Sequence, residues 1–301
     1  MDEFFLENVP DLSRWGAIQQ QNFDGPRPHT CDILRCQIND QSPIYQTIIE
    51  DMACVIASTR LTREYFNLWA QAAKRTHQLS PENMKSIACA LARGIATSQS
   101  NYEQGMPECN DENLKGHIAE ILLFCLRVNL LGRDRVSQYL FQPPRPKENP
   151  STPGIDLFEL GQSDDGYYFQ LWECKGTDDY IEQRLSEAAK QLCLFHRTAK
   201  QSFMEAYRSI VDLIPSGNSG LLDFYNQIPR RFFNSLPHES KRLGGSITFS
   251  LSEEQPNLTL FAKHVNGAVS GRHVHCHVAI VSIINFPKFR NDVYKYLWNI
   301  Y

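Results

Sequence analysis

The chain has 301 residues, of which 42% are hydrophobic, and a formal net charge of −4 at pH 7. This length and apolar fraction allow a sizeable core, in one large domain or two smaller ones. A transmembrane helix is excluded because the chain has no run of about eighteen apolar residues, and the acidic amino terminus is unlike a signal peptide. The weak negative charge excludes binding to nucleic acid by net charge alone, so any DNA must be bound through local patches or with a partner's help.

The nine cysteines are an odd number, and none of them forms a Cys-x-x-Cys pair. Several lie in apolar stretches, which is typical of reduced cysteines in the core of an intracellular protein. This usage indicates neither a disulfide framework nor a zinc ribbon. We therefore expect a cytoplasmic protein.

The amino-terminal part of the chain reads as a helical module. Its first 41 residues contain three prolines and are expected to be irregular, with a short strand at residues 31–38. Helix-start signals follow at Ser42-Pro43, Thr62 and Ser80-Pro81. Each of these signals places a capping hydroxyl before a helical pattern, and two of them add a proline at the first helical position. We predict a mainly helical module over residues 1–105, with packing or partner binding as its role.

A polar stretch at residues 98–113 is the best linker, and we expect a second domain over residues 106–301. Residues 114–131 form an expected helix that is apolar almost all round and is therefore predicted to be buried. Glu120 lies in the middle of this helix. An ionised carboxylate without a partner is costly to bury, so Glu120 is protonated, paired, bound to a metal or extended to solvent.

A β-hairpin is predicted at residues 154–175, where two runs rich in β-branched and aromatic residues flank an Asp-Gly pair. Side chains alternate along a strand, so Glu173 and Lys175 share one face. With an even number of residues in the turn, Asp156 joins them on that face, roughly 5–8 Å away. A three-residue bulged turn would break this parity. The basic segment before the hairpin, residues 132–153, is either a phosphate-tracking loop or plain solvated surface.

A long helix is expected from about residue 177 to residue 209, with Lys190 and Gln191 beside its buried stripe. Residues 210–245 are expected to be loops with short helices. Three strands are predicted after them, at residues 246–251, 257–264 and 273–284. A final amphipathic helix is expected to pack on that sheet.

The last of these strands carries three histidines on one face, His273, His275 and His277. Alternating histidines can bind a transition metal, although they are more often the polar face of a half-buried strand.

The hairpin combines groups that suit phosphodiester hydrolysis. Two or three carboxylates around one point bind a hard divalent cation, usually Mg²⁺. Such an ion polarises a phosphoryl oxygen and activates a bound water. Lys175 is placed to orient or deprotonate that water, or to stabilise the developing charge. The alternative is a surface salt-bridge cluster, but the apolar residues around Glu173 indicate a strand buried on both faces.

These residues resemble the PD-(D/E)xK nuclease superfamily over residues 114–197. The resemblance rests on Glu120 in a helix, Gly154-Ile155-Asp156, Glu173-Cys174-Lys175, and a helix with Lys190-Gln191. Ile155 departs from the proline of the family's name. The resemblance implies an α/β fold with a restriction-endonuclease-like core, in which helices flank a central mixed sheet. The helical leader and the carboxy-terminal block are most similar to prokaryotic antiphage-defence nucleases, such as the nuclease subunit of Hachiman systems.

The same resemblance implies roles for five residues. Asp156 and Glu173 would be metal ligands, Glu120 a further ligand or water-holding residue, Lys175 the catalytic lysine and Gln191 a supporting residue. The expected activity is Mg²⁺-dependent hydrolysis of DNA, with Mn²⁺ as a substitute metal, in antiphage defence or DNA processing. A helicase or ATPase partner is the expected regulator, and a homodimer fits the cutting of two strands.

Two other functions stay open at this point. The first is a catalytically silent relative that binds nucleic acid or scaffolds a complex. The second is a metallohydrolase that uses the His273, His275 and His277 face, although these histidines lack a carboxylate at ligand spacing.

Overall fold

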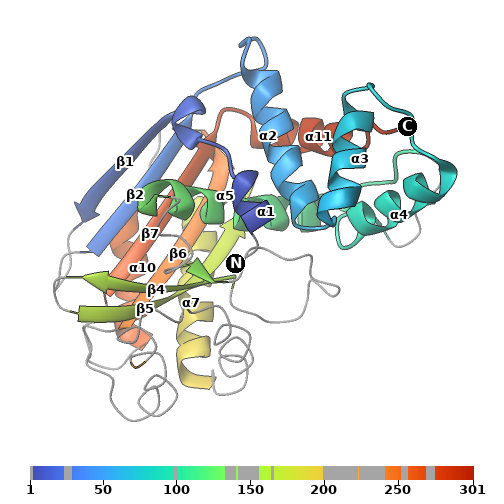
Figure 1. The fold of residues 1–301 in the computed structure, drawn as a ribbon. Coiled ribbons are helices and arrows are strands. Elements are labelled where there is room, and N and C mark those ends of the chain that lie inside the picture. The colour runs from blue at the N-terminus through green and yellow to red at the C-terminus, as the bar shows by residue number, and fades with distance from the viewer. Residues whose placement is uncertain are drawn as a thin grey trace.

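The computed structural model describes residues 3–23, 29–97, 101–102, 104–132, 140–141, 156–163, 166–198, 223, 241–251, 257–268 and 275–301. Within these ranges the chain forms a mixed seven-stranded β-sheet with helices packed against it (Figure 1). The expectation of an α/β protein with a central mixed sheet flanked by helices is confirmed.

The strands are β1 (Ala17–Phe23), β2 (His29–Cys36), β3 (Leu140–Phe141), β4 (Leu157–Ser163), β5 (Gly166–Gly176), β6 (Lys241–Ser250) and β7 (His275–Ile283). Their order across the sheet is β1-β2-β7-β6-β5-β4-β3. The four central strands β2, β7, β6 and β5 are parallel, whereas β1 at one edge and β4 and β3 at the other run antiparallel to their neighbours. Parallel strands need cover on both faces, which agrees with the almost continuous burial of β7.

The helices are α1 (Glu3–Glu7), the 3-10 helix η1 (Leu12–Arg14), α2 (Tyr45–Ser58), α3 (Arg63–Ala73), α4 (Pro81–Ala92), α5 (Asp111–Leu131), α7 (Ile181–Thr198), α10 (Leu258–Ala268) and α11 (Phe286–Leu297). Two glycines show which helix covers which face of the sheet. A Cβ on Gly176 would lie 2.8 Å from Lys115 of α5, and one on Gly245 would lie 2.3 Å from Phe261 of α10. Gly245 pairs with Glu173 of β5, so the two residues point to the same face of the sheet. Even-numbered residues of β5 therefore face α5, whereas odd-numbered residues face α10 and its neighbour α7.

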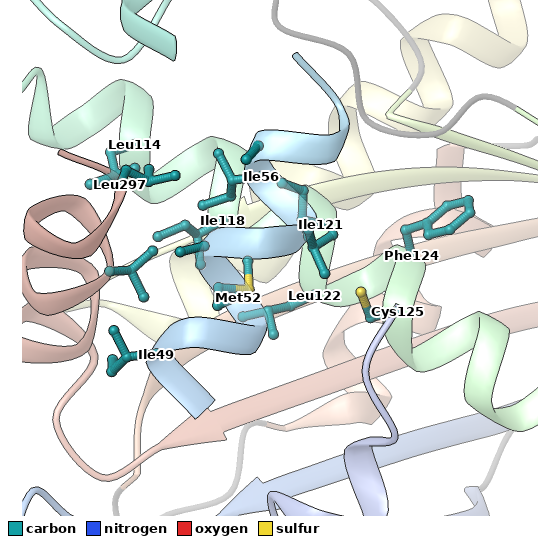
Figure 2. Close-up of a cluster of buried hydrophobic side chains, with 14 of the residues drawn as sticks. Ile49, Met52, Ile56, Leu114, Ile118, Ile121, Leu122, Phe124, Cys125 and Leu297 are labelled. Atoms are coloured by element: carbon teal, nitrogen blue, oxygen red, sulfur yellow. The ribbon is translucent and has the colours of Figure 1, made fainter. Parts of the chain in front are cut away.

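A hydrophobic core lies where α5 meets α2 and α11 (Figure 2). Buried side chains of α2 interleave there with Ile118 and Leu122 of α5 and with Leu297 of α11. This core joins residues from both sides of the boundary expected at residue 105, and residues 17–36 supply two strands to the sheet. Figure 1 shows α2, α3, α4 and α11 gathered at one end of the sheet.

Several predicted helix starts are confirmed. The Thr62 hydroxyl accepts the Tyr65 N–H at the start of α3, and the Ser80 hydroxyl accepts the Asn83 N–H at the start of α4. The first helix begins at Tyr45 instead of Pro43, without a side-chain cap. All nine cysteines are free, as predicted.

Three predictions of secondary structure are wrong. Residues 17–23, expected to be irregular, form β1. Their polar sequence lacks the apolar pattern of a strand, and they form one because their backbone pairs with β2. Residues 257–264, expected to be a strand, belong largely to α10, where Phe261, Ala262 and Val265 bury one helical face. Strand β6 begins at Lys241 instead of residue 246. The final helix α11 packs chiefly on α2, and it also contacts α5 and the expected sheet through β6 and β7.

Some predicted features lie outside the described residues. They are the basic segment at 132–153 apart from Gly132 and β3, the helix beyond residue 198, most of the loop region at 210–245, and His273.

Candidate active site

The β4–β5 hairpin has the even-numbered turn on which the predicted placement of Asp156 depends. Ser163 pairs with Gly166, so the turn contains two residues, and Leu157 pairs with Trp172. Asp156 directly precedes β4, and its N–H donates to the carbonyl of Trp172, the partner of Leu157. Asp156 therefore lies beside Trp172 and Glu173 at the open end of the hairpin.

Glu173 and Lys175 form a close ion pair near the carboxyl end of β5. Lys175 Nζ donates to Glu173 Oε1 at 2.6 Å, and the two side chains are 24% and 4% exposed, respectively. Burial lowers the pKa of Lys175, but the charge and hydrogen bond of Glu173 and the charge of Asp156 raise it above its usual value. A buried carboxylate is tolerated when a cation neutralises it, and Lys175 fulfils this role here.

Asp156 is anchored to the backbone of β5. Its Oδ2 accepts the Cys174 N–H at 2.8 Å, and its own N–H donates to the Trp172 carbonyl at 3.2 Å. The carboxylate is thus fixed beside the peptide that joins Glu173 to Lys175. Asp156 is half-buried, so one of its edges stays close to solvent.

Glu120 lies on the other side of β5. Burial, followed by the charges of Asp156 and Glu120, raises the pKa of the Cys174 thiol well above its usual value. Glu120 is therefore close to Cys174, on the face that α5 covers, whereas Glu173 and Lys175 point to the face that α7 covers. Glu120 itself is half-buried. The structure pairs Glu173 with Lys175 and anchors Asp156 to the Cys174 N–H, while Glu120 on α5 is close enough for its charge, like that of Asp156, to act on the Cys174 thiol.

Gln191 belongs to α7, which packs on β5 and β6. It is half-buried and lies one turn after Glu187 on the same helical face. Burial raises the pKa of Glu187, but bonds from neighbouring α7 side chains and the charge of Lys175 bring it below its usual value. The sequence analysis did not select Glu187, although its spacing of four residues from Gln191 places both side chains on one face of α7.

The donor chemistry at Asp156 and Glu173 suits a hard cation, because both residues present carboxylate oxygens. The geometry is not that of a formed metal site. Across the described residues no three His, Cys, Asp or Glu side chains converge closely enough to hold an ion. Lys175 also occupies one oxygen of Glu173. A cation bound by these residues would therefore have to share Glu173 with the ammonium.

A second polar cluster lies on the face covered by α5, at the level of Trp172 and Cys174 in the sheet register. The Arg127 Nε and Nη2 donate to the two carboxylate oxygens of Glu159 at 3.0 and 2.9 Å, and Nη1 donates to Asp32. His277 Nε2 lies 2.7 Å from Asp32 Oδ2. All four side chains are at most 5% exposed. Arg127 was not among the predicted site residues, although an arginine in an apolar helix is as unusual as the carboxylate of Glu120.

This cluster explains the histidines of β7. His277 faces the buried Asp32 and the Trp172 ring, while His275 is half-buried and lies 3.2 Å from Thr30 Oγ1. The interpretation of these histidines as the polar face of a half-buried strand is therefore wrong for His277, because β7 is a central strand and His277 is buried.

No protein-family model matches this chain, and no curated protein sequence is similar to it at a significant level. Among the described residues, none of the helices has the length and apolar character needed to cross a bilayer. The case for a function therefore rests on the chemistry of the site.

Proposed function

We propose that the protein is a metal-dependent nuclease that hydrolyses phosphodiester bonds of DNA. The observation that carries this proposal is the buried Glu173, paired with Lys175 at 2.6 Å beside the anchored carboxylate of Asp156. Charged side chains are seldom buried in the middle of a sheet unless they are needed for chemistry or for a strong structural pair.

The order of the elements supports the same proposal. Helix α5, the β4–β5 hairpin and helix α7 follow one another along the chain, and each carries the residue type that the PD-(D/E)xK resemblance implies. We propose a restriction-endonuclease-like core built from these elements and β6. In this proposal the strands β1, β2 and β7 extend that core.

Asp156 and Glu173 would hold Mg²⁺, with Mn²⁺ as a substitute. The bound ion supplies electrophilic activation of the phosphoryl group and a water of lowered pKa. The Lys175 ammonium stabilises negative charge that develops on the phosphoryl oxygens, and Glu173 fixes its position. Gln191 supports this arrangement from α7. Glu120 takes part as a ligand or water-holding residue only if its side chain turns from the Cys174 side toward the end of the hairpin.

A second candidate function is favoured by the absence of a formed metal site among the described residues. In that case the protein is a catalytically silent relative that binds nucleic acid or scaffolds a complex. Titration calorimetry with Mg²⁺ and Mn²⁺ separates the two, because a silent scaffold has no need to bind the ion.

The proposal includes the setting in which the nuclease works. The net charge of −4 gives no long-range attraction to DNA, which supports recruitment by a helicase or ATPase partner. A cytoplasmic role in antiphage defence or DNA processing, with a homodimer for cutting both strands, completes the proposal.

The decisive experiment is a cleavage assay on supercoiled plasmid, linear duplex and single-stranded DNA in Mg²⁺ or Mn²⁺, with EDTA as the metal-free control. We expect cleavage to fall about 100-fold or more in Glu173→Gln and Lys175→Met, because each variant removes a positioned charge. Lys263→Met is the matched control, since Lys263 is exposed on α10 and is not part of the site.

Full activity in both site variants would show that the hairpin is not the active site. If no variant cuts DNA and calorimetry detects no bound metal, the silent scaffold is the correct function. Metal binding without cleavage would instead point to a nuclease that needs its partner.

A further inference from the structure

Tyr180 is an exposed aromatic residue in the connection between β5 and α7. Its relative exposure is 78%, which is the highest among the exposed large hydrophobic residues that the structure describes. It follows Lys175 by five positions in the chain, so their Cα atoms are at most about 17 Å apart. The end of β5 thus carries both the proposed catalytic lysine and an aromatic ring that contributes little to the core.

The backbone of Tyr180 is in the left-handed region, with φ of +57°. This conformation is unfavourable for a bulky residue, and glycine or asparagine adopts it more readily. Among the described non-glycine residues only Arg75 shares it, also with φ of +57°. Arg75 ends α3, where the N–H of Thr76 closes the last turn on the Gln71 carbonyl, which is an ordinary reason for a left-handed residue. Tyr180 precedes a helix, so that reason does not apply.

The segment around Tyr180 is held firmly. The Thr177 N–H donates to the Thr248 carbonyl at 2.9 Å, and the Asp178 carboxylate is bound by Arg290 at 2.6 and 3.2 Å. On the other side the Tyr180 carbonyl accepts the Arg184 N–H at 3.1 Å. The outward direction of the tyrosine is therefore fixed by its neighbours, and strain retained in such a rigid segment is a common sign of a functional residue.

The position of α7 relates Tyr180 to the site. Helix α7 packs on β5 and β6, and it contacts α10, which covers the face of the sheet to which the odd-numbered residues of β5 point. Helix α7, which Tyr180 precedes, therefore runs along the side of the sheet that carries Lys175. A nucleic-acid strand bound at Lys175 would pass within a few nucleotides of the Tyr180 ring.

We propose that Tyr180 stacks on an unpaired base next to the phosphate that is cleaved, so that the substrate is single-stranded or locally unpaired DNA. This inference rests on the nuclease function proposed above. An exposed aromatic ring offers a face to any base, and the loss of such a ring weakens binding by about 5- to 150-fold. Inside a duplex both faces of a base are covered by its neighbours, so only an unpaired base can stack on Tyr180.

The test measures binding of a fluorescently labelled single-stranded oligonucleotide and of a matched hairpin duplex, in a Lys175→Met background that prevents cleavage. We expect Tyr180→Ala and Tyr180→Asn to weaken single-strand binding at least fivefold, and Tyr180→Phe to stay within twofold, because phenylalanine keeps the ring. Duplex binding should change less than twofold. An oligonucleotide with 2-aminopurine at the unpaired position should show quenching that disappears in Tyr180→Ala.

Two controls separate stacking from a general defect. Tyr180→Asn suits the left-handed backbone, so its melting temperature should equal or exceed that of the parent protein. Tyr301→Ala removes another exposed tyrosine, whose ring stacks on Trp298, and should leave DNA binding unchanged.

The outcomes distinguish this inference from the proposed nuclease function. If the wild type cuts DNA while all Tyr180 variants bind single strands equally well, stacking is refuted and the nuclease stands. Equal losses of duplex and single-strand binding in Tyr180→Ala also overturn it. If no form of the protein binds or cuts DNA, both proposals fail together.

Discussion

Replacement of Arg127 by methionine tests the electrostatic account of the buried cluster. The guanidinium neutralises two carboxylates, Asp32 and Glu159, whose side chains are completely buried. Methionine keeps much of the apolar stem but removes the charge and three hydrogen bonds. Two ionised groups would then remain in the core without their common cation.

The expected loss of unfolding free energy is about 3–5 kcal/mol, the usual cost of removing one partner from a buried ion pair. Asp32 keeps its contact with His277, and Glu159 keeps hydrogen bonds from Tyr168 at 3.0 Å and Trp172 at 3.3 Å. These remaining donors keep the loss within that range, although two carboxylates are affected.

The assay is urea unfolding at pH 7, followed by tryptophan fluorescence and circular dichroism. Arg127→Met is compared with the double variant Arg127→Met/Glu159→Gln, which should be more stable than the single variant by about 1 kcal/mol, because one unpaired charge is gone. Arg184→Met is the control, since its pair with Glu187 is partly exposed and should contribute only about 0.3–0.5 kcal/mol.

Two results would refute this reasoning. A loss below about 1 kcal/mol in Arg127→Met would be that of a surface pair, and the cluster would not be a buried electrostatic network. A double variant less stable than the single variant would show that Glu159 stabilises the fold through contacts other than Arg127.

Two further predictions concern packing and pH. In Gly244→Ala the new Cβ would lie 2.3 Å from the Trp172 ring, so we expect the free energy of unfolding, measured in urea, to fall by about 1–3 kcal/mol. In Gly116→Ala, within α5, the new Cβ would have no atom within 4 Å, so the free energy of unfolding should rise by about 0.5–1 kcal/mol. Similar effects of the two substitutions would contradict this prediction. Burial raises the pKa of Asp178, but its pairing with Arg290 brings it below the usual value. That pairing stabilises the fold above the unfolded pKa of about 3.9 and is lost as the pH falls further, so Asp178→Asn should be less stable than the wild type at pH 7 by about 1 kcal/mol. Thermal unfolding from pH 7 to pH 3 should show that difference closing, and a constant difference would refute it.

Some features of the candidate site follow from residues that are close in sequence, and others depend on the packing of distant elements. The alternation of side chains along a strand and the even turn length are properties of neighbouring residues, and they predicted the hairpin and the shared face of Glu173 and Lys175. The side of the sheet on which Glu120 lies depends on how α5 packs, and the sequence carries no signal for that choice. The contact between Lys175 and Glu173 likewise required the folded arrangement.

The sequence by itself determined the elements whose signals are local. Thr62 and Ser80 cap their helices because a hydroxyl near an unsatisfied N–H needs only a few residues of chain. The burial of α5 and of the centre of β5 also follows from their apolar composition.

Only the tertiary structure decided which distant segments meet. Strand β2 joins the sheet by pairing with β7. Asp32 contacts His277, which lies 245 residues later in the sequence. Residues 257–268 form a helix because the face with Phe261 and Val265 is buried against neighbouring elements, a choice that a short apolar run leaves open. Such contacts depend on packing between elements far apart in sequence. Where local propensity and packing favour different structures, packing decides which one forms.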